Sequence, residues 1–195
     1  MNESDKVVFL ILAYLNILMW FFPLIRHYKG EYFFFFLVSN CSNVLTFITW
    51  KIFAQNTNLM TVFFSLLLIP VVEKNLLKKL PDKLTYIAVA VLLTAVFLLI
   101  NTPSVTILFV LLIYLILVLI FLRRIILCLA FSSEINLIHT LLLFYCLSIV
   151  VKIYNGLIGP GVGYYNVLVF QVLDIMLAII FSVVTEKTKV FKIKF

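Results

Sequence analysis

The segment "FQVLDIML", residues 170–177, contains one carboxylate, Asp174, in the middle of an otherwise apolar stretch. The stretch extends over about residues 164–185, and about 20 predominantly apolar residues are enough for a helix to cross the hydrocarbon core of a bilayer. An ionised aspartate at the centre of such a helix costs at least about 2.5 kcal/mol. The segment therefore predicts a transmembrane helix in which Asp174 needs polar partners from other helices.

The composition of the whole chain indicates that most of its surface faces lipid. Of the 195 residues, 65% are hydrophobic and 12% are charged, whereas a soluble domain is about half apolar and about one quarter charged. A protein of 22.6 kDa has too large a ratio of surface to volume to bury that much apolar surface in a soluble core. We predict a single all-α transmembrane domain over residues 1–195, with the lipid bilayer as its main partner.

Apolar runs separated by charged or turn-forming residues predict seven transmembrane helices. The separators include "RHYKGEY" at residues 26–32, "NTPS" at 101–104 and "RRIILCLAFSSE" at 123–134. Each run is close to the length that a membrane-spanning helix requires. The predicted spans are about residues 7–25, 32–53, 59–77, 85–101, 105–127, 133–155 and 164–185.

The distribution of Lys and Arg predicts the orientation of these helices. Twelve of the 15 basic residues belong to the first, third and fifth connections and the C-terminal segment, and the opposite side has only Lys6, Lys51 and Lys152. Cytoplasmic loops carry the excess of positive charge, so we expect the N-terminus outside and the C-terminus in the cytoplasm. Because the basic residues are dispersed over short loops, we expect no nucleic-acid partner. We expect the basic tail, residues 186–195, to lie on anionic lipid headgroups.

Polar residues of four spans fall at nearly one depth in the bilayer. One polar residue lies near the midpoint of the first, second, sixth and seventh spans, and helical spacing adds further polar residues to the same faces. Polar residues within a membrane face the interior of a helix bundle, where partners can satisfy them. We therefore expect these four helices to enclose a polar interior. Its candidate ligand- or proton-binding residues are Asp174, Asn16, Asn43, Tyr145, Gln171, Ser39 and Lys152.

Two interpretations of this polar interior remain open. In the first, hydrogen bonds between Asp174 and its neighbours only join the helices. In the second, Asp174 belongs to a ligand, ion or proton site within a cavity. Lys152 lies roughly 11 Å outward of the level of Asp174, at a rise of about 1.5 Å per residue, so we expect its long side chain to reach the outer interface instead. The spans 85–101 and 105–127 are almost wholly apolar and are expected to face lipid or a partner protein.

Other residue types point away from metals, cofactors and catalysis. Cys41, Cys128 and Cys146 all lie inside apolar runs, so we expect neither a disulfide framework nor a zinc site. His139 is expected to make an interhelical contact and not to bind a metal. Motifs of metalloproteases, nucleophilic hydrolases and phosphate-binding loops are absent from the sequence, so we expect no enzyme. Trp20 lies near a span end, where aromatic belts are found.

A resemblance to a known group of proteins rests on the second and third spans. The stretch "FFFFLVSNCSNVLTFITWKIFAQNTNLMTVFFSLLLIPVVE", residues 33–73, resembles small seven-helix membrane proteins of Bacteroidota. In those proteins a polar second helix is followed by an Asn-rich outer loop and a third helix that ends in an acidic residue. The corresponding residues here are Asn56, Asn58 and Glu73. The resemblance extends to the membrane sensor modules that precede histidine kinase domains, and it implies a sensory role.

These observations lead to two hypotheses of function. The first is a non-catalytic sensory or assembly subunit that works with another membrane protein, docked on the spans 85–101 and 105–127. Because the chain ends after the last span, its signal is expected to pass through that partner. The second is a small carrier or channel that uses the polar residues around Asp174. The high content of Phe, Ile, Lys and Asn is typical of an AT-rich genome, and we expect a multi-pass protein of a bacterial cytoplasmic (inner) membrane.

Overall fold

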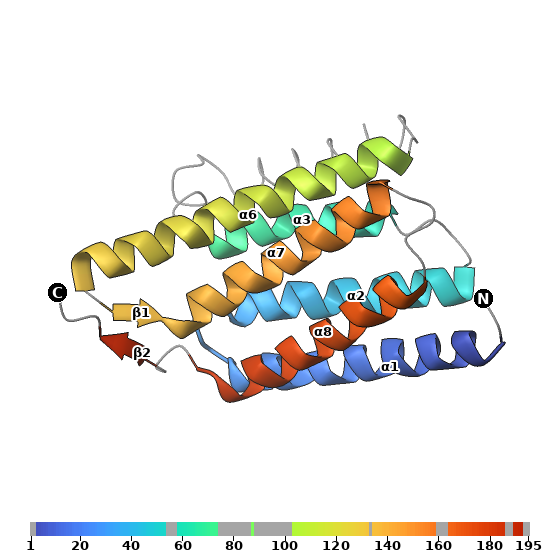
Figure 1. The fold of residues 1–195 in the computed structure, drawn as a ribbon, viewed down its shortest axis with the longest axis horizontal. Helices are drawn as coiled ribbons and strands as arrows, with labels where there is room; N and C mark the ends of the chain where they lie inside the picture. The colour runs from blue at the N-terminus through green and yellow to red at the C-terminus, as the bar shows by residue number, and fades with distance from the viewer. Residues whose placement is uncertain are drawn as a thin grey trace.

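The computed structural model describes residues 3–53, 58–73, 87, 103–132, 134–158, 164–185 and 189–192. Within these residues the chain forms six helices and two short strands (Figure 1), which confirms the predicted all-α fold class. The helices are α1 (Glu3–Arg26), α2 (Phe33–Phe53), α3 (Asn58–Val72), α6 (Pro103–Ser132), α7 (Leu137–Ile158) and α8 (Tyr164–Val183). The strands are β1 (Glu134–Asn136) and β2 (Lys189–Lys192).

Three of the helices are long and apolar enough to cross a membrane, which indicates a membrane protein. The three segments are Val7–Arg26 of α1, Val105–Ser132 of α6 and Leu137–Asn155 of α7. Shorter apolar segments occupy the other three helices, at Phe33–Thr49, Met60–Val72 and Leu168–Val183. The predicted span at residues 85–101 lies outside the described residues, except for Ile87.

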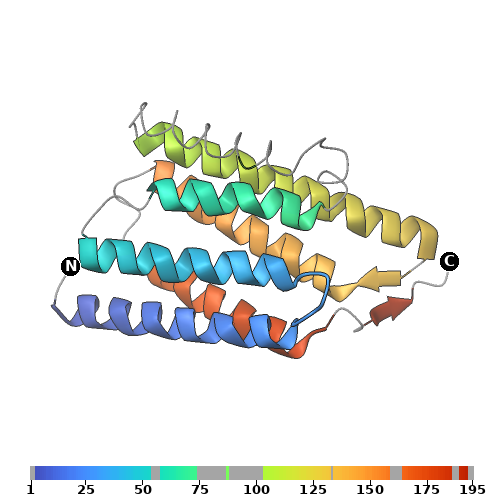
Figure 2. The ribbon, with the colours of Figure 1, turned by 180° about the vertical axis from the view of Figure 1, so that it is seen from behind.

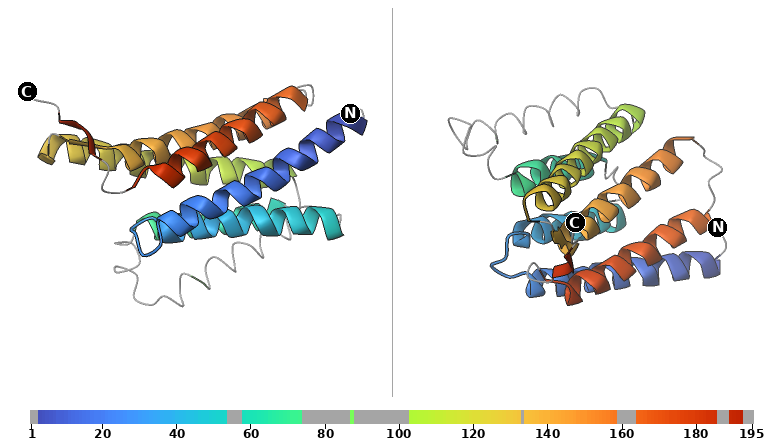
Figure 3. Two further views of the ribbon diagram at one scale, coloured as in Figure 1. Left: turned by 90° about the horizontal axis from the view of Figure 1, so that it is seen from below. Right: turned by 60° about the vertical axis from the view of Figure 1, so that its left-hand side comes forward.

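The helices lie side by side along one long axis. α1 packs against α2 and α8, α3 against α2 and α6, and α7 against α6 and α8. Seen from behind, α1, α2, α3 and α6 follow one another across the bundle, with α7 and α8 on the far side (Figure 2). We call the end at which α1 begins and α2 ends the N-terminal end, and the opposite end, next to the sheet, the C-terminal end (Figures 1 and 3).

Consecutive described helices alternate in direction, with one exception. α3 and α6 both run from the N-terminal end to the C-terminal end, as their colours show in Figure 2. The same direction follows from a hydrogen bond between the end of α3 and the last third of α6, in which Arg124 Nη2 donates to the Val72 carbonyl. The chain therefore leaves α3 at one end of the bundle and enters α6 at the other.

The predicted connection at residues 123–134 is wrong over most of its length, because α6 continues as a helix to Ser132. The two arginines that suggested a loop do not both need to leave the bundle. Arg124 Nη1 donates to Glu31 Oε1 at 2.9 Å and to Tyr32 Oη at 2.7 Å. A guanidinium with several acceptors is satisfied inside a helix bundle, and residues 125–130 are apolar enough to continue the helix.

The C-terminal segment forms a strand that pairs with another part of the same chain. The expectation of a lipid-bound tail did not include this contact. β2 pairs antiparallel with β1, the connection between α6 and α7, so that Ile135 lies opposite Phe191. This two-stranded sheet lies at the C-terminal end of the bundle (Figure 1). Backbone groups of residues 189–192 are thereby paired in strand hydrogen bonds.

Aromatic rings fill the middle of the bundle, and we call this cluster the aromatic floor. Its neighbouring rings have centroid distances between 5.1 and 6.4 Å. Trp20 is 1% exposed, so its predicted place in an interfacial aromatic belt is wrong. Its ring faces other helices of the bundle instead of the headgroups, in contact with α2, α7 and α8. The members of the aromatic floor are Trp20, Phe35, Phe36, Phe121, Tyr145 and Phe181.

The expectation that the span 105–127 faces only lipid or a partner holds for one side of α6. The other side packs into the core, where Ile113, Leu117 and Phe121 are buried. Leu112 and Leu119 remain exposed on the opposite side. An all-apolar helix sequence carries no mark of which face is buried, because lipid and protein interiors are both apolar.

Candidate functional site

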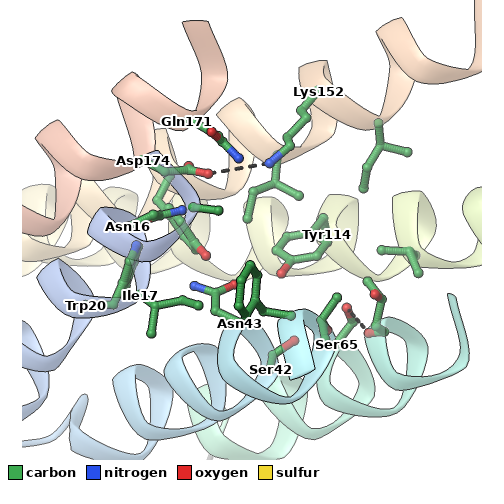
Figure 4. Close-up of a pocket in the computed structure, with 18 of the residues that line it drawn as sticks. Asn16, Ile17, Trp20, Ser42, Asn43, Ser65, Tyr114, Lys152, Gln171 and Asp174 are labelled. Carbon is green, nitrogen blue, oxygen red and sulfur yellow. Dashed lines mark hydrogen bonds and ion pairs between the residues drawn. The ribbon is translucent and has the colours of Figure 1, made fainter. Parts of the chain in front are cut away.

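A cavity of about 600 Å³ lies inside the bundle, between the aromatic floor and the N-terminal end (Figure 4). All six described helices contribute side chains to its wall. Its volume is within the range of about 300–1,000 Å³ that is typical of small-molecule sites. The polar side chains that line it are Asn16, Ser42, Asn43, Thr46, Thr61, Ser65, Thr106, Tyr114, Tyr145, Lys152, Gln171 and Asp174.

The structure brings together the residues that the sequence analysis selected by depth. Six of the seven candidate residues line this cavity, and the seventh, Ser39, lines a smaller adjoining pocket of about 30 Å³. Asn43 and Tyr145 line both spaces. The four helices expected to enclose a polar interior therefore do so, and α3 and α6 complete the wall.

Lys152 lies against Asp174, so the expectation that it reaches away to the outer interface is wrong. Its Nζ is 3.5 Å from Asp174 Oδ2, and the two side chains are 43% and 13% exposed. The predicted span ends at residue 155, but α7 continues to Ile158. Lys152 is thus six residues from the end of α7 and Asp174 is ten residues from the start of α8. The difference of four residues is about 6 Å along the axis, which a lysine side chain spans.

Two buried amide oxygens in the wall have no hydrogen-bond partner. They are Oδ1 of Asn16 on α1 and Oε1 of Gln171 on α8, and the Gln171 side chain as a whole is 8% exposed. Figure 4 shows both residues beside Asp174. A buried polar atom without a partner costs about 1–3 kcal/mol. The cavity wall therefore has two hydrogen-bond acceptors without donors beside Asp174. Asp174 is the only carboxylate among the described lining residues.

The hydroxyl groups that α3 and α6 supply are not among the residues predicted from the sequence. Tyr114 is buried on α6 and lines both the cavity and the smaller pocket. On α3, Ser65 Oγ donates to the Thr61 carbonyl at 2.6 Å, and both residues line the cavity. The spacing of four residues between Thr61 and Ser65, one helical turn, was a signal for a shared face. A single tyrosine in the apolar run of α6 offered no comparable pattern.

The cavity is open near the N-terminal end and closed toward the C-terminal end. Lys152 lines the cavity and is 43% exposed, which places an opening at its level. Trp20 and Tyr145 line the opposite side of the cavity and belong to the aromatic floor. Phe36 and Phe181 close the space behind them, with ring centroids 5.2 Å apart. The geometry is that of a pocket with an opening beside Lys152 and an aromatic base.

No group of three or more metal-ligating side chains occurs in the part of the chain that the structure describes. His139 makes an interhelical contact, with its Nδ1 3.9 Å from Cys128 Sγ and its ring packed on Tyr32. This contact lies at the C-terminal end, away from the cavity.

The described cavity lining can bind a ligand through one ion pair, several hydroxyl groups and several amides.

No known protein family, curated protein or solved structure matches the chain. The resemblance to seven-helix proteins of Bacteroidota therefore stays a prediction.

Proposed function

We propose that this chain is a seven-helix protein of a bacterial inner membrane that binds a small polar molecule in the cavity and serves as a non-catalytic sensory subunit of a membrane complex. The observation that carries the proposal is the cavity of about 600 Å³, with an ion pair and two unpaired buried amide oxygens in its wall. A bundle that needed polar contacts only to join its helices would pair these groups with one another. Unpaired groups around an open space favour a ligand.

The directions of the described helices support the proposal of seven spans. Because α3 ends and α6 begins at opposite ends of the bundle, the chain has to pass from one end to the other between them. The proposed span at residues 85–101 supplies this passage. In the proposed orientation the entrance of the cavity faces the outside, and the arginine at position 124 and the sheet lie on the cytoplasmic side.

The closed aromatic floor favours a sensor over a channel. A channel needs a continuous polar path, whereas the described rings of Trp20, Tyr145 and Phe181 pack together below the cavity. Lys152 contacts Asp174 in the cavity wall, and this arrangement supports binding of a ligand. The exposed apolar side of α6, with Leu112 and Leu119, is the proposed contact with a partner, together with residues 85–101.

The test is to purify the tagged full chain from native membranes and identify, by native mass spectrometry, the small molecules and proteins that remain bound. We expect a bound small molecule and a stoichiometric membrane-protein partner. Asp174→Asn is expected to lose the small molecule and keep the partner, because it removes the negative charge of the described cavity lining without changing the lipid-facing side of α6. Asp5→Asn, a change of the same kind outside the cavity lining, is the control. A chain without a bound molecule or a partner contradicts the proposal.

A carrier is the second candidate, and the ion pair favours it. Ionisable side chains within a membrane mark substrate or ion pathways, and Lys152 and Asp174 lie between the opening of the cavity and its floor. A carrier also has to open the aromatic floor during its cycle. Reconstitution into vesicles separates the two candidates, because a carrier moves the bound molecule across the bilayer and a sensor only binds it.

A further inference from the structure

The carboxylate of the described cavity lining and its two unpaired amide oxygens lie on one wall, formed by α1 and α8. Asp174 and Gln171 lie three residues apart on one face of α8, and Asn16 approaches them from α1, which packs along α8. The carboxylate of Asp174 and the buried oxygens of both amides are all hydrogen-bond acceptors. Neither amide oxygen has a donor. This wall is therefore suited to a group that carries a positive charge and several N–H donors, such as a primary ammonium.

The positive charge of the cavity comes from the neighbouring wall, on α7. Lys152 Nζ is 3.5 Å from Asp174 Oδ2, which is longer than the 2.7–2.9 Å of a close charge-assisted hydrogen bond. An ammonium has three donors, so Lys152 has N–H groups left for a second acceptor. The side chain is 43% exposed and its four-carbon stem is flexible, so it can move to meet an anionic group that enters through the opening.

We propose that the cavity binds a zwitterion with a primary ammonium and a carboxylate, as in an amino acid or a short peptide; this rests on the proposed function of ligand binding. The ligand ammonium contacts the acceptors of Asp174, Gln171 and Asn16. The ligand carboxylate contacts Lys152. The internal ion pair is thereby exchanged for two ion pairs with the ligand. Because the described lining has one positive and one negative side chain, a zwitterion leaves neither uncompensated, whereas a simple amine or a simple acid leaves one charge without a partner.

The rest of the wall favours a zwitterion with an apolar side chain. Ile17, Ile149 and Ile153 line the cavity together with the charged groups, and Trp20 lies at its base. Apolar surface placed against these side chains leaves water, which is favourable. L-Leucine and the dipeptide Leu-Leu are therefore suitable probes.

The experiment measures binding of these probes to the full chain in lipid nanodiscs by isothermal titration. Two analogues of leucine lack one charge each: 3-methylbutylamine lacks the carboxylate and 4-methylpentanoate lacks the ammonium. We expect saturable binding of L-leucine or Leu-Leu, and at least about tenfold weaker binding of both analogues, because each loses one of two ion pairs in a partly desolvated site. Equal binding of leucine and either analogue overturns the inference.

Variants test which wall of the cavity contacts the ammonium of the ligand and which contacts its carboxylate. Lys152→Met is expected to weaken binding of leucine and 4-methylpentanoate and to strengthen binding of 3-methylbutylamine, because Asp174 then has no internal ion pair to break. Asp174→Asn is expected to weaken binding of leucine and 3-methylbutylamine and to strengthen binding of 4-methylpentanoate. If Asp174→Asn does not fold, Gln171→Met, which retains Asp174, is expected to weaken binding of leucine and 3-methylbutylamine. Lys29→Met at the C-terminal end is the matched control and is expected to bind like the wild type. Lys152→Met binding leucine as tightly as the wild type contradicts the proposed carboxylate contact.

The failure of this inference differs from the failure of the proposed function. If a small molecule copurifies with the chain but has no ammonium or no carboxylate, and neither probe displaces it, the zwitterion is wrong and ligand binding stands. If no molecule copurifies and neither probe binds, both are wrong.

Discussion

Arg124 Nη1 on α6 donates a hydrogen bond of 2.7 Å to Tyr32 Oη, just before α2, across a separation of 92 residues. The same guanidinium donates to Glu31 and to the Val72 carbonyl at the end of α3. One side chain thus joins the turn between α1 and α2, the end of α3 and the last third of α6. A planar guanidinium with five donors makes such contacts simultaneously, and a lysine ammonium lacks that geometry.

Arg124→Lys is expected to destabilise the protein by about 2 kcal/mol, although it keeps the charge. The loss comes from the contacts with Tyr32 and Val72, because hydrogen bonds from charged groups contribute about 1.5–3 kcal/mol. The contact with Glu31, which is 47% exposed, contributes little. The measurement is the free energy of unfolding in bicelles by steric trapping.

Arg123→Lys is the matched control for this prediction. Arg123 is the preceding residue of the same helix and its side chain is exposed, so the change is expected to stay within about 0.5 kcal/mol of the wild type. Equal effects of the two substitutions show that the contacts of Arg124 do not stabilise the C-terminal end.

The ion pair between Lys152 and Asp174 is expected to contribute modestly to stability. A double-mutant cycle of Lys152→Gln and Asp174→Asn is predicted to give a coupling energy of about 1 kcal/mol. The value is small because Lys152 is 43% exposed and the two charged atoms are 3.5 Å apart. A coupling energy above about 3 kcal/mol is the signature of a buried structural pair, and it argues against exchange of this pair for a ligand.

The aromatic floor is expected to stabilise the bundle strongly. Trp20→Ala removes a ring that is 1% exposed and packed on Tyr145 and Phe181, and a loss of about 3 kcal/mol follows from the lost packing and the cavity left behind. Leu18→Ala on the same helix is the control. Leu18 is 58% exposed, and lipid tails replace its contacts at little cost. The measurement is the midpoint of thermal unfolding of both variants in nanodiscs. Similar midpoints for Trp20→Ala and Leu18→Ala contradict the stabilising role of the aromatic floor.

The sequence was sufficient to select all five charged and amide residues of the described cavity lining. Asn16, Gln171 and Asp174 each interrupt an apolar run, and Asn43 belongs to a polar stretch of the second span. A polar group within a membrane faces the bundle interior, where partners can satisfy it. Their common depth followed from counting residues along spans of similar length. Lipid excludes the alternative of a polar residue on an exposed face of the helix.

The contacts that sequence reasoning missed depend on helix rotation and on helix ends. Tyr114 reaches the cavity because packing against α3 and α7 fixes the rotation of α6, and a helix that is apolar all round does not reveal that rotation. Lys152 meets Asp174 because α7 continues past the predicted end at residue 155. Trp20 lies in the core because its neighbours on other helices are aromatic. No local sequence pattern in α1 indicates these neighbours.

Seven spans with the N-terminus outside make a prediction about accessibility from the two sides of the membrane. In a variant with Cys41, Cys128 and Cys146 replaced by Ser, single cysteines are introduced by Asn2→Cys, Lys29→Cys or Lys189→Cys. A membrane-impermeant maleimide applied to intact spheroplasts is expected to label only the Asn2→Cys chain. The other two are expected to react only after permeabilisation, because Lys29 and Lys189 lie at the C-terminal end of the bundle. If Asn2→Cys and Lys189→Cys react from the same side, the number of spans is even and the proposed crossing between α3 and α6 is wrong.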